Sequence, residues 1–496
     1  MRILVVGGSA AGLFAGLVLA RSGHEVLLLD RDPLVPAADV DAAAEAAFRP
    51  AAPQLAHPHV VLPRCRELLR ERLPDVYAAL LAAGAAEAPL ATQMPPTLSD
   101  RSTWPGDERL TPLMTRRSTF DWVLRRAAAA QPGLTVRDGV AVTGLLARPG
   151  TPPRVIGVHT DDGDHQADLV VDATGRRSAI DRWLAMIDAP ATATDWAECT
   201  MAYYSRHYRL RTSAGLPGPP TTRVVAALDE FTIGIWGADN GTMVLAIVPL
   251  VEDKRFRRVA QADVFTAVAR AVPLLVPWLD VLEPISPVFP MGGLQNTFRR
   301  LVVDGMPVVT GLAAVGDSVC TTNPTLARGI ALALRSALDL TDALDHAEDP
   351  IGLARALDRA AGEHVQPFFT DQAAIDAARL AELRHTLLGA PAPAPPDRPE
   401  RVSFAQLRSA AAFDPLVFRA FWQVFGMLRL PEEVYVDPAV VARTHLVLRE
   451  RGGGPPIAQP SRAQLARALE AAPSTVPPSP GCGPATRTSP WTGSDR

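Results

Sequence analysis

Residues 3–32 read ILVVGGSAAGLFAGLVLARSGHEVLLLDRD, and this stretch decides the fold. It opens on an apolar run typical of a buried strand, after which Gly7, Ser9 and Gly12 follow at the spacing of a G-x-G-x-x-G turn. Leu13–Arg21 has the composition of a helix. A helix that begins at such a turn presents its free N–H groups and the positive end of its dipole to a phosphate. The stretch therefore predicts a phosphate-binding strand, turn and helix.

The second half of the stretch extends this prediction to a dinucleotide. Glu25–Leu29 is a second apolar strand, and it ends at Asp30, about 20 residues beyond the turn, where a carboxylate can accept hydrogen bonds from a ribose. Ser9 departs from the pattern because it replaces the central glycine, which lets the phosphate approach the backbone. Serine is small and can itself donate a hydrogen bond, so we expect the site to function.

Two further motifs occur later in the chain. ADLVVDATGRRS occupies residues 167–178, and GLAAVGDSVCTTNPTLARG occupies residues 311–329. Each one alone could arise by chance. Their order and separation relative to the first motif indicate that three distant segments meet around one flavin nucleotide.

In these motifs the chain resembles the single-domain FAD-dependent monooxygenases with the para-hydroxybenzoate hydroxylase fold. That group also includes squalene- and polyether-type epoxidases and flavin halogenases. The resemblance covers roughly residues 1–345, and the spelling DATG at 172–175 is closer to the epoxidase and halogenase branch than to the aromatic hydroxylases that spell it DADG. It implies an α/β fold: a discontinuous Rossmann-like FAD-binding domain, an inserted and mainly antiparallel-sheet substrate domain, and a helical C-terminal region.

The resemblance also implies roles for single residues. Asp30 would bind the adenosine ribose, Asp317 would hold the ribityl hydroxyls, and the helix that begins near Gly329 would stabilise negative charge on the reduced ring. No side chain is assigned as catalytic and none as a metal ligand. The implied cofactor-binding residues are Gly7, Ser9, Ala10, Ala11, Gly12, Asp30, Arg31, Arg117, Val142, Asp172, Gly175, Gly316, Asp317, Pro324, Gly329 and Ile330.

Because FAD motifs recur along the chain, the FAD domain must be interrupted by an insertion. Within it, Phe231–Trp236 and Met243–Val248 predict a hairpin around an Asn-Gly turn, and Val264–Leu279 predicts one helix with an apolar stripe. Further helices are predicted at 330–346, 351–388, 403–428 and 438–451. The predicted domains are an FAD-binding domain at 1–75, 105–185 and 301–346, a substrate-side domain at 76–104 and 186–300, a helical C-terminal region at 347–451, and a disordered tail at 452–496.

A strand predicted at 200–210 provides the candidate wall of the substrate site. Its alternation places two sets of side chains on opposite faces, and the sequence leaves open which face covers the flavin. The segment QLAHPHVVL at 54–62 resembles the family's Q-x-x-H-x-H segment, which implies flavin-side structural roles for its histidines rather than a metal pair. The first set is Met201, Tyr203, Ser205 and His207, and the second is Tyr204, Arg206 and Tyr208.

Composition excludes several classes of protein. The net charge of −4, from 49 basic and 53 acidic residues, gives no basic field for nucleic acid or an anionic membrane. No apolar run reaches the roughly 18 residues needed to span a bilayer, and we expect no signal peptide because the chain opens directly on the nucleotide-binding strand. The cysteines are scattered without metal or disulfide spacing, which predicts a reduced, cytoplasmic compartment. They are Cys65, Cys199, Cys320 and Cys482.

The resemblance implies a monooxygenase that inserts one oxygen atom from O2 into an apolar or aromatic small molecule, in secondary metabolism. The flavin halogenases of this family need a lysine near the flavin. Halogenation is disfavoured because the only lysine, Lys254, lies in a polar EDKR segment far from that location. Electrons would come from NAD(P)H, directly or through a flavin reductase, and we expect NAD(P)H alone to reduce the flavin slowly. Two alternatives stay open: an FAD-dependent dehydrogenase or reductase of the same fold, and a non-catalytic flavin-binding protein.

Overall fold

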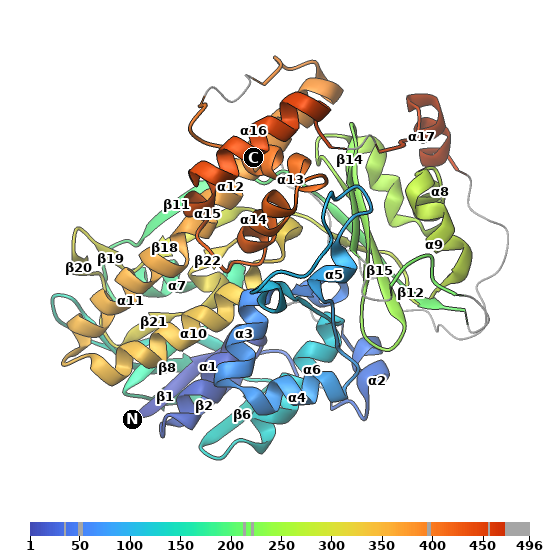
Figure 1. Cartoon of the computed structure of the whole chain (residues 1–496). Coiled ribbons are helices and arrows are strands. Elements are labelled where there is room, and N and C mark those ends of the chain that lie inside the picture. The colour runs from blue at the N-terminus through green and yellow to red at the C-terminus, as the bar shows by residue number, and fades with distance from the viewer. Residues whose placement is uncertain are drawn as a thin grey trace.

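A five-stranded parallel sheet forms the base of the molecule, in the order β21-β10-β1-β2-β6 (Figure 1). The computed structural model describes residues 1–33, 36–47, 53–211, 215–219, 223–393, 398–454 and 457–471. The three motifs supply strands of this sheet, whose apolar central strands are buried on both faces as parallel sheets require. The strands are β1 (Arg2–Val6), β2 (Glu25–Asp30), β6 (Leu134–Asp138), β10 (Leu169–Asp172) and β21 (Leu312–Ala314).

Different layers cover the two faces of this sheet. One face carries α1 (Ala10–Arg21), α6 (Arg117–Ala130) and α10 (Gly329–His346), whose apolar side chains share a core with the strands. The other face carries the antiparallel sheet of β7 (Val142–Arg148), β8 (Arg154–Thr160) and β9 (Gly163–Gln166). The carboxyl ends of the parallel strands are left free of both layers, which is the usual place for a ligand in such sheets.

The helices before residue 83 belong with the FAD-binding part of the chain. α3 (Pro63–Arg72) and α4 (Pro74–Ala82) pack against each other, and α4 also packs against α6. The predicted boundary between residues 75 and 76 therefore falls inside α4. Just beyond this helix, β4 (Ala86–Glu87) pairs with β5 (Leu113–Met114), so this segment of the predicted substrate-side domain lies against the base.

The predicted insertion contains an antiparallel sheet in the order β13-β14-β15-β12-β16, with β17 also paired to β12. The hairpin is present as predicted, with Gly237 opposite Met243 and a turn in which Asn240 and Gly241 both adopt positive φ. The strands are β12 (Tyr203–Leu210), β13 (Arg223–Ala227), β14 (Phe231–Gly237), β15 (Thr242–Pro249), β16 (Leu282–Pro284) and β17 (Phe289–Met291).

Two contacts fix this sheet to the base. At the hairpin turn, the fully buried carboxylate of Asp239 accepts hydrogen bonds from the Arg116 backbone N–H at 2.6 Å and from its Nε at 2.8 Å. A second connection is the small sheet of β11 (Ala193–Ala197), β18 (Asn296–Arg300) and β22 (Cys320–Thr321), which joins the insertion to the third motif. The insertion is therefore attached at two places, the hairpin turn in its middle and the small sheet near its chain ends.

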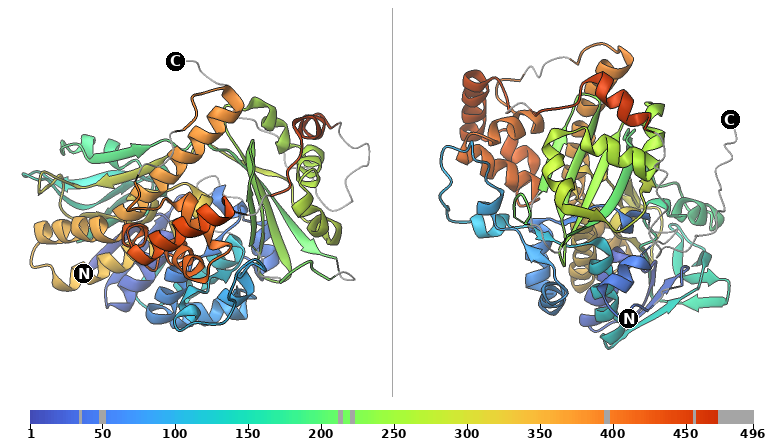
Figure 2. Two further views of the ribbon diagram at one scale, coloured as in Figure 1. Left: turned by 45° about the horizontal axis from the view of Figure 1, so that its top comes forward. Right: turned by 90° about the vertical axis from the view of Figure 1, so that its right-hand side faces the viewer.

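The outer face of the sheet is covered by helices rather than by solvent (Figure 2, left). The single helix predicted at Val264–Leu279 is wrong, because the segment forms α8 (Ala262–Arg270) and, after a short 3-10 turn, α9 (Val276–Val281). Pro273 causes the break, since it has no N–H to donate and forces Val272 into an extended conformation. Among the described helices, none is alone long and apolar enough to cross a membrane, and only this pair, bent by 102°, passes on length and composition.

Proline also divides two of the predicted C-terminal helices. The helix predicted at 351–388 is two helices, α11 (Pro350–His364) and α12 (Gln366–Leu388), with Pro367 in the first turn of the second. The helix predicted at 403–428 is likewise α13 (Phe404–Ala411) and α14 (Pro415–Phe425). The helices predicted at 330–346 and 438–451 are present as α10 and α16 (Pro438–Arg451), and a short α15 (Pro431–Tyr435) precedes the latter.

A helix lies inside the tail that the sequence analysis predicts to be disordered. α17 (Arg462–Leu469) begins at a capping box formed by Ser461 and Gln464, and it buries Leu465 and Leu469 against α8. The prediction is therefore wrong for these residues, because their apolar spacing of four buries one face once a partner helix is available. Residues 472–496 of the predicted tail lie outside the described residues.

Candidate functional site

The turn between β1 and α1 is built on close backbone contacts. Gly7 has a φ of 108°, and a Cβ there would lie 2.5 Å from the carbonyl oxygen of Ala173 in the second motif. A Cβ on Gly12 would lie 1.8 Å from the carbonyl oxygen of Gly7. Ser9 is the N-cap residue of α1, and its hydroxyl caps no backbone N–H of that helix. Two of the three turn positions thus require glycine, Gly12 for close packing and Gly7 for its positive φ as well.

Asp30 lies at the end of β2, as predicted, and is 5 % exposed. Its Oδ2 accepts a hydrogen bond from the Gly8 N–H at 2.7 Å, and its Oδ1 accepts one from the Asp32 N–H at 2.8 Å. A carboxylate has further acceptor sites beyond these two. Arg31 points outward, with 55 % of its side chain exposed.

Asp172 lies at the end of β10, and both of its carboxylate oxygens accept hydrogen bonds within its own loop. Its Oδ1 accepts hydrogen bonds from the Thr174 N–H at 2.9 Å and from the Thr174 hydroxyl at 2.6 Å, and its Oδ2 accepts one from the Ser178 hydroxyl. The carboxylate therefore shapes the DATG loop, and its part in cofactor binding stays a prediction. Gly175 is held in place by a bond from its N–H to Ser318 Oγ at 2.9 Å, which connects the second motif to the third.

The three motifs meet around one cleft of about 140 Å³. The segment predicted from the Q-x-x-H-x-H resemblance contributes Gln54 and His59 to it. Val142 lies in β7 and packs into the apolar cluster on the other face of the sheet. The predicted residues that line the cleft are Ser9, Ala10, Ala11, Arg117, Gly175, Asp317, Pro324, Gly329 and Ile330. Those that do not line it are Gly7, Gly12, Asp30, Arg31, Val142, Asp172 and Gly316.

Two arginines give the cleft positive charge. Arg117 donates from Nε to Asp121 Oδ1 at 2.6 Å and reaches Ser9 Oγ with Nη2 at 3.5 Å. Arg176 is not among the predicted cofactor-binding residues, although it stands in the GRR run that follows Asp172. Its Nη1 is buried and has no hydrogen-bond partner among the described residues. Burial lowers the pKa of Arg176, and the neighbouring Arg177 adds to this effect.

Asp317 lies in the cleft wall between Gly175 and Gly329. Burial raises the pKa of its carboxyl group, and the charges of Arg117 and Arg176 oppose that shift. The unpartnered Arg176 Nη1 and the N-terminus of α1 fit a diphosphate, and the Asp317 carboxylate in the same cleft fits sugar-like hydroxyls. The residues present therefore fit a dinucleotide cofactor with a polyol chain.

A second, larger cavity of about 420 Å³ adjoins this cleft. The two spaces share Pro58, Pro324 and Ala327 as lining residues. Most of its wall is apolar, and it combines the inner face of the β12–β15 sheet with α12 and α13. The sheet contributes Met201, Tyr203, Val225, Ala227, Thr232, Trp236, Ala246 and Val248.

The structure decides which face of β12 points inward. Met201 and Tyr203 line the cavity, and Ser205 and His207 contact the segment that contains His57. On the opposite face, Tyr204 and Tyr208 pack with α8 and α9, which cover that side of the sheet. The sequence left open which face of this strand points inward. The structure shows that it is the face that carries Tyr203.

A buried polar network lies where the cavity meets the cleft. Asp376 of α12 accepts hydrogen bonds from Asn296 Nδ2 at 2.7 Å, from Asn323 Nδ2 at 2.8 Å and from Gln372 Nε2 at 3.0 Å. Burial raises the pKa of Asp376, and the three amides oppose that shift. Asn323 Oδ1 accepts in turn from the Tyr203 hydroxyl. The network fixes the loop that contains Pro324 against the cavity wall.

His57 lines the cavity and is 4 % exposed. Its Nδ1 shares a hydrogen bond of 2.7 Å with Ser205 Oγ. Burial lowers the pKa of His57 to about 3, and that of His59 to about 3 as well, so both rings are neutral at physiological pH. Within the described residues, no group of three histidine, cysteine or acidic side chains is arranged to hold a metal ion.

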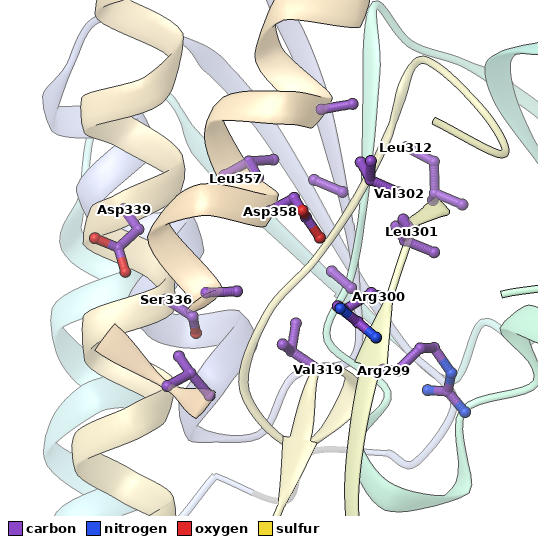
Figure 3. Close-up of a pocket in the computed structure, with 15 residues that line it drawn as sticks. Arg299, Arg300, Leu301, Val302, Leu312, Val319, Ser336, Asp339, Leu357 and Asp358 are labelled. Atoms are coloured by element: carbon purple, nitrogen blue, oxygen red, sulfur yellow. The ribbon is translucent and has the colours of Figure 1, made fainter. Parts of the chain in front are cut away.

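A third space, of about 60 Å³, lies between β18, β21, α10 and α11 (Figure 3). Asp358 and Arg300 both face it, and burial raises the pKa of Asp358. None of the residues predicted for cofactor binding lines this space. It is a gap in helix-to-sheet packing, separate from the cleft and its adjoining cavity.

Comparisons with known proteins bear on the fold. No family model matches the sequence. Protein Rv3254 of Mycobacterium tuberculosis is 26% identical over 468 residues, covering 88% of this chain and 91% of that protein.

Solved structures with similar folds include flavin-dependent enzymes. The flavin-dependent brominase Bmp2 has a TM-score of 0.59 at 16% identity, covering 91% of this chain and 100% of its own. PqsL of Pseudomonas aeruginosa in complex with 2-aminobenzoylacetate has a TM-score of 0.55 at 14% identity, covering 78% and 98%. 2-Methyl-3-hydroxypyridine-5-carboxylic acid oxygenase has 0.51 at 17% identity, covering 78% and 92%. The chain has the fold of the flavin-dependent monooxygenases. The predicted fold class is confirmed.

The first prediction concerns Asp317. The motifs predict FAD in the cleft, so Asp317→Ala should weaken FAD binding by about 1.5–3 kcal/mol, the range for hydrogen bonds to a charged group. This corresponds to a loss of affinity of roughly tenfold to a hundredfold, measured by titrating the apoprotein with FAD. Asp195→Ala, at an exposed position of β11, is the control and should bind normally. Unchanged affinity in a folded Asp317→Ala protein would show that the third motif is misassigned.

The second prediction concerns His57 and acid stability. Its folded pKa of about 3 lies below the value of about 6.5 in the unfolded chain, so only the unfolded chain takes up this proton between those limits. The contribution of His57 to the free energy of unfolding is therefore complete above about pH 6.5. It falls by about 1.4 kcal/mol for each pH unit below that value. His57→Gln should lose about 1.4 kcal/mol less than wild type between about pH 7.5 and 5.5 in urea unfolding.

The exposed His346→Gln serves as the matched control. It should lose as much stability as the wild type over the same pH interval. An equal acid loss in His57→Gln and wild type would contradict the account of a neutral, buried His57.

Proposed function

We propose that this protein is an FAD-dependent monooxygenase that inserts one oxygen atom from O2 into an apolar or aromatic small molecule, by hydroxylation or epoxidation. The observation that carries the proposal is the direct contact between the two spaces, since Pro58, Pro324 and Ala327 line both the cleft and the cavity. A molecule in the cavity would lie next to a ring held at the inner end of the cleft. The cavity volume of about 420 Å³ is within the range of small-molecule sites.

In this proposal the cleft holds FAD through the residues described above. Arg117, Arg176 and the start of α1 would bind the diphosphate, and Asp317 would bind the ribityl chain. The N-terminus of α10, at Gly329, would favour negative charge on the ring. FAD supplies the activation of oxygen when it is bound. The buried apolar wall excludes water from the reacting centre, which the protein has to do for oxygen transfer to compete with hydrolysis.

Halogenation is the second use that relatives make of this fold, and Bmp2 is described as a brominase. The chain's single lysine, Lys254, is exposed and donates to the Val251 carbonyl oxygen at 3.0 Å. It lines neither the cleft nor the cavity. This placement supports oxygen insertion over halogenation.

The same fold can also serve hydride transfer, so an FAD-dependent dehydrogenase or reductase stays the alternative. A non-catalytic flavin-binding protein is disfavoured, since such a protein has no need of a large cavity beside the flavin cleft. Cys65, Cys199 and Cys320 are buried free thiols. They support the proposal of a reduced, cytoplasmic compartment, and a role in secondary metabolism is part of the same proposal.

The electron source is proposed to be NAD(P)H, with substrate or a flavin reductase needed for rapid reduction. Among the described residues, the parallel sheet of the cleft is the one sheet of the dinucleotide-binding type. The acidic net charge of −4 offers no concentrated basic field for a nucleotide phosphate. A reductase partner or a transient surface site is consistent with both observations.

Labelled oxygen tests the proposed reaction. Turnover of a substrate under ¹⁸O2 should place one labelled atom in the product, because a monooxygenase transfers one atom of O2 and releases the other as water. The product is analysed by mass spectrometry, with H2¹⁸O under unlabelled O2 as the control. Product that forms without oxygen, by loss or gain of two hydrogens, would instead establish the dehydrogenase or reductase alternative.

Stopped-flow mixing tests the electron source. The oxidised holoenzyme is mixed with NADH or NADPH in the absence of substrate, and the visible flavin band is followed. Bleaching should be slow with either nucleotide and should accelerate when a flavin reductase is added. Rapid bleaching by one nucleotide alone would show that this nucleotide reduces the flavin directly, without control by substrate or a reductase.

A further inference from the structure

Three charged side chains line the outer end of the cavity. Arg379 and Glu382 of α12 and Arg408 of α13 line it together, and both the Glu382 and the Arg408 side chains are exposed. At the other end, near the flavin cleft, lining residues such as Tyr203 and Ala246 are buried. The cavity thus has a closed, mostly apolar inner end and an open, charged outer end.

Most charges along this wall are neutralised within the protein. Asp371 pairs with Arg328 at 2.5 Å and accepts from the Tyr435 hydroxyl at 2.7 Å. Arg401 forms an ion pair with Glu432. Asp376 is surrounded by the three amides already described. The two ion pairs therefore leave no net charge, and the Asp376 carboxylate is occupied as a hydrogen-bond acceptor by the three amides.

The outer cluster differs, because it contains two guanidinium groups and one carboxylate. Arg379 contacts Glu382 Oε2 at 3.2 Å and donates from Nη2 to the Leu228 carbonyl oxygen, while its buried Nε has no partner among the described residues. Among the residues that the structure describes, Arg408 makes no ion pair and no hydrogen bond. One positive charge is therefore left over beside apolar walls.

We infer that the substrate carries an oxyanion, a carboxylate or a chemically similar monoanion, that binds between Arg379 and Arg408 while its apolar body extends inward toward Pro324. Guanidinium groups bind carboxylates through paired, charge-assisted hydrogen bonds, and these are stronger than neutral ones. The inference rests on the proposed function, since it takes the cavity to be the substrate site. It narrows the substrate class from apolar small molecules to apolar acids, oriented with the acidic group away from the flavin.

Isothermal calorimetry on the FAD-loaded enzyme tests the site directly. The probes are benzoate, 2-naphthoate and decanoate, each compared with its own primary amide, which has nearly the same shape but no charge. At least one acid should bind about tenfold more tightly than its amide, the difference expected when a charge-assisted bond is replaced by a neutral one. A panel in which no acid binds more tightly than its amide overturns the inference.

Two variants should shift the preference in opposite directions. Arg408→Gln should weaken binding of the preferred acid by about tenfold and leave its amide unchanged. Glu382→Gln removes the competing carboxylate, so it should strengthen binding of the same acid. Arg449→Gln, at an exposed position of α16, is the matched control and should keep the wild-type preference. Weaker acid binding in Glu382→Gln, or an unchanged preference in Arg408→Gln, overturns the inference.

The outcome can be separated from that of the proposed function. Calorimetry on the oxidised holoenzyme needs neither O2 nor an electron donor, so it reports charge recognition even if the chemistry is hydride transfer. Conversely, labelled oxygen in a product would stand even if acids and amides bound equally well.

Discussion

The rest of the structure depends on how closely α1 approaches the turn that precedes it. The Gly12 α-carbon faces the Gly7 carbonyl oxygen with no room for a side-chain carbon between them. The third motif approaches the same helix with similar closeness, since a Cβ on Gly316 would lie 2.6 Å from that of Ala11. Both contacts set the width of the cleft, because its opposite walls are the first turn of α1 and the loop around Asp317. A larger residue at Gly316 would push the third motif away from the first, and one at Gly12 would push α1 away from its own turn.

The parts of the site that the sequence predicted correctly are those governed by local backbone geometry. Glycine spacing located the turn, and the strand that ends at Asp30 is present as expected. Asp172 shows where such reasoning stops, because its motif indicated the right loop but not that Thr174 and Ser178 would occupy its carboxylate. Arg176 stood in the same motif, yet only the folded chain shows its unpaired buried nitrogen. Hydrogen-bond partners chosen in three dimensions leave no trace in spacing.

The errors in helix prediction have a different cause. The apolar periodicity of 264–279 is real, and both halves of the segment bury an apolar face, but Pro273 interrupts the hydrogen-bond ladder between them. The sequence predicted only the sheet side of the cavity wall, and this has a third cause. The family resemblance ended near residue 345, whereas α12 and α13 provide much of the wall opposite the sheet. Segments without a recognisable motif thus complete a site whose cofactor side was predictable.

The network around Asp376 has a direction that follows from what each group is able to do. An ionised carboxylate only accepts hydrogen bonds, so Asn323 must turn its NH2 group toward Asp376 and its oxygen toward Tyr203. The Tyr203 hydroxyl must then donate a hydrogen bond to Asn323 Oδ1. Because its hydrogen is engaged with Asn323, the tyrosine oxygen offers lone pairs to the cavity that it lines. The charge of Asp376 on α12 therefore determines that the Tyr203 hydroxyl can bind a ligand in the cavity only as a hydrogen-bond acceptor.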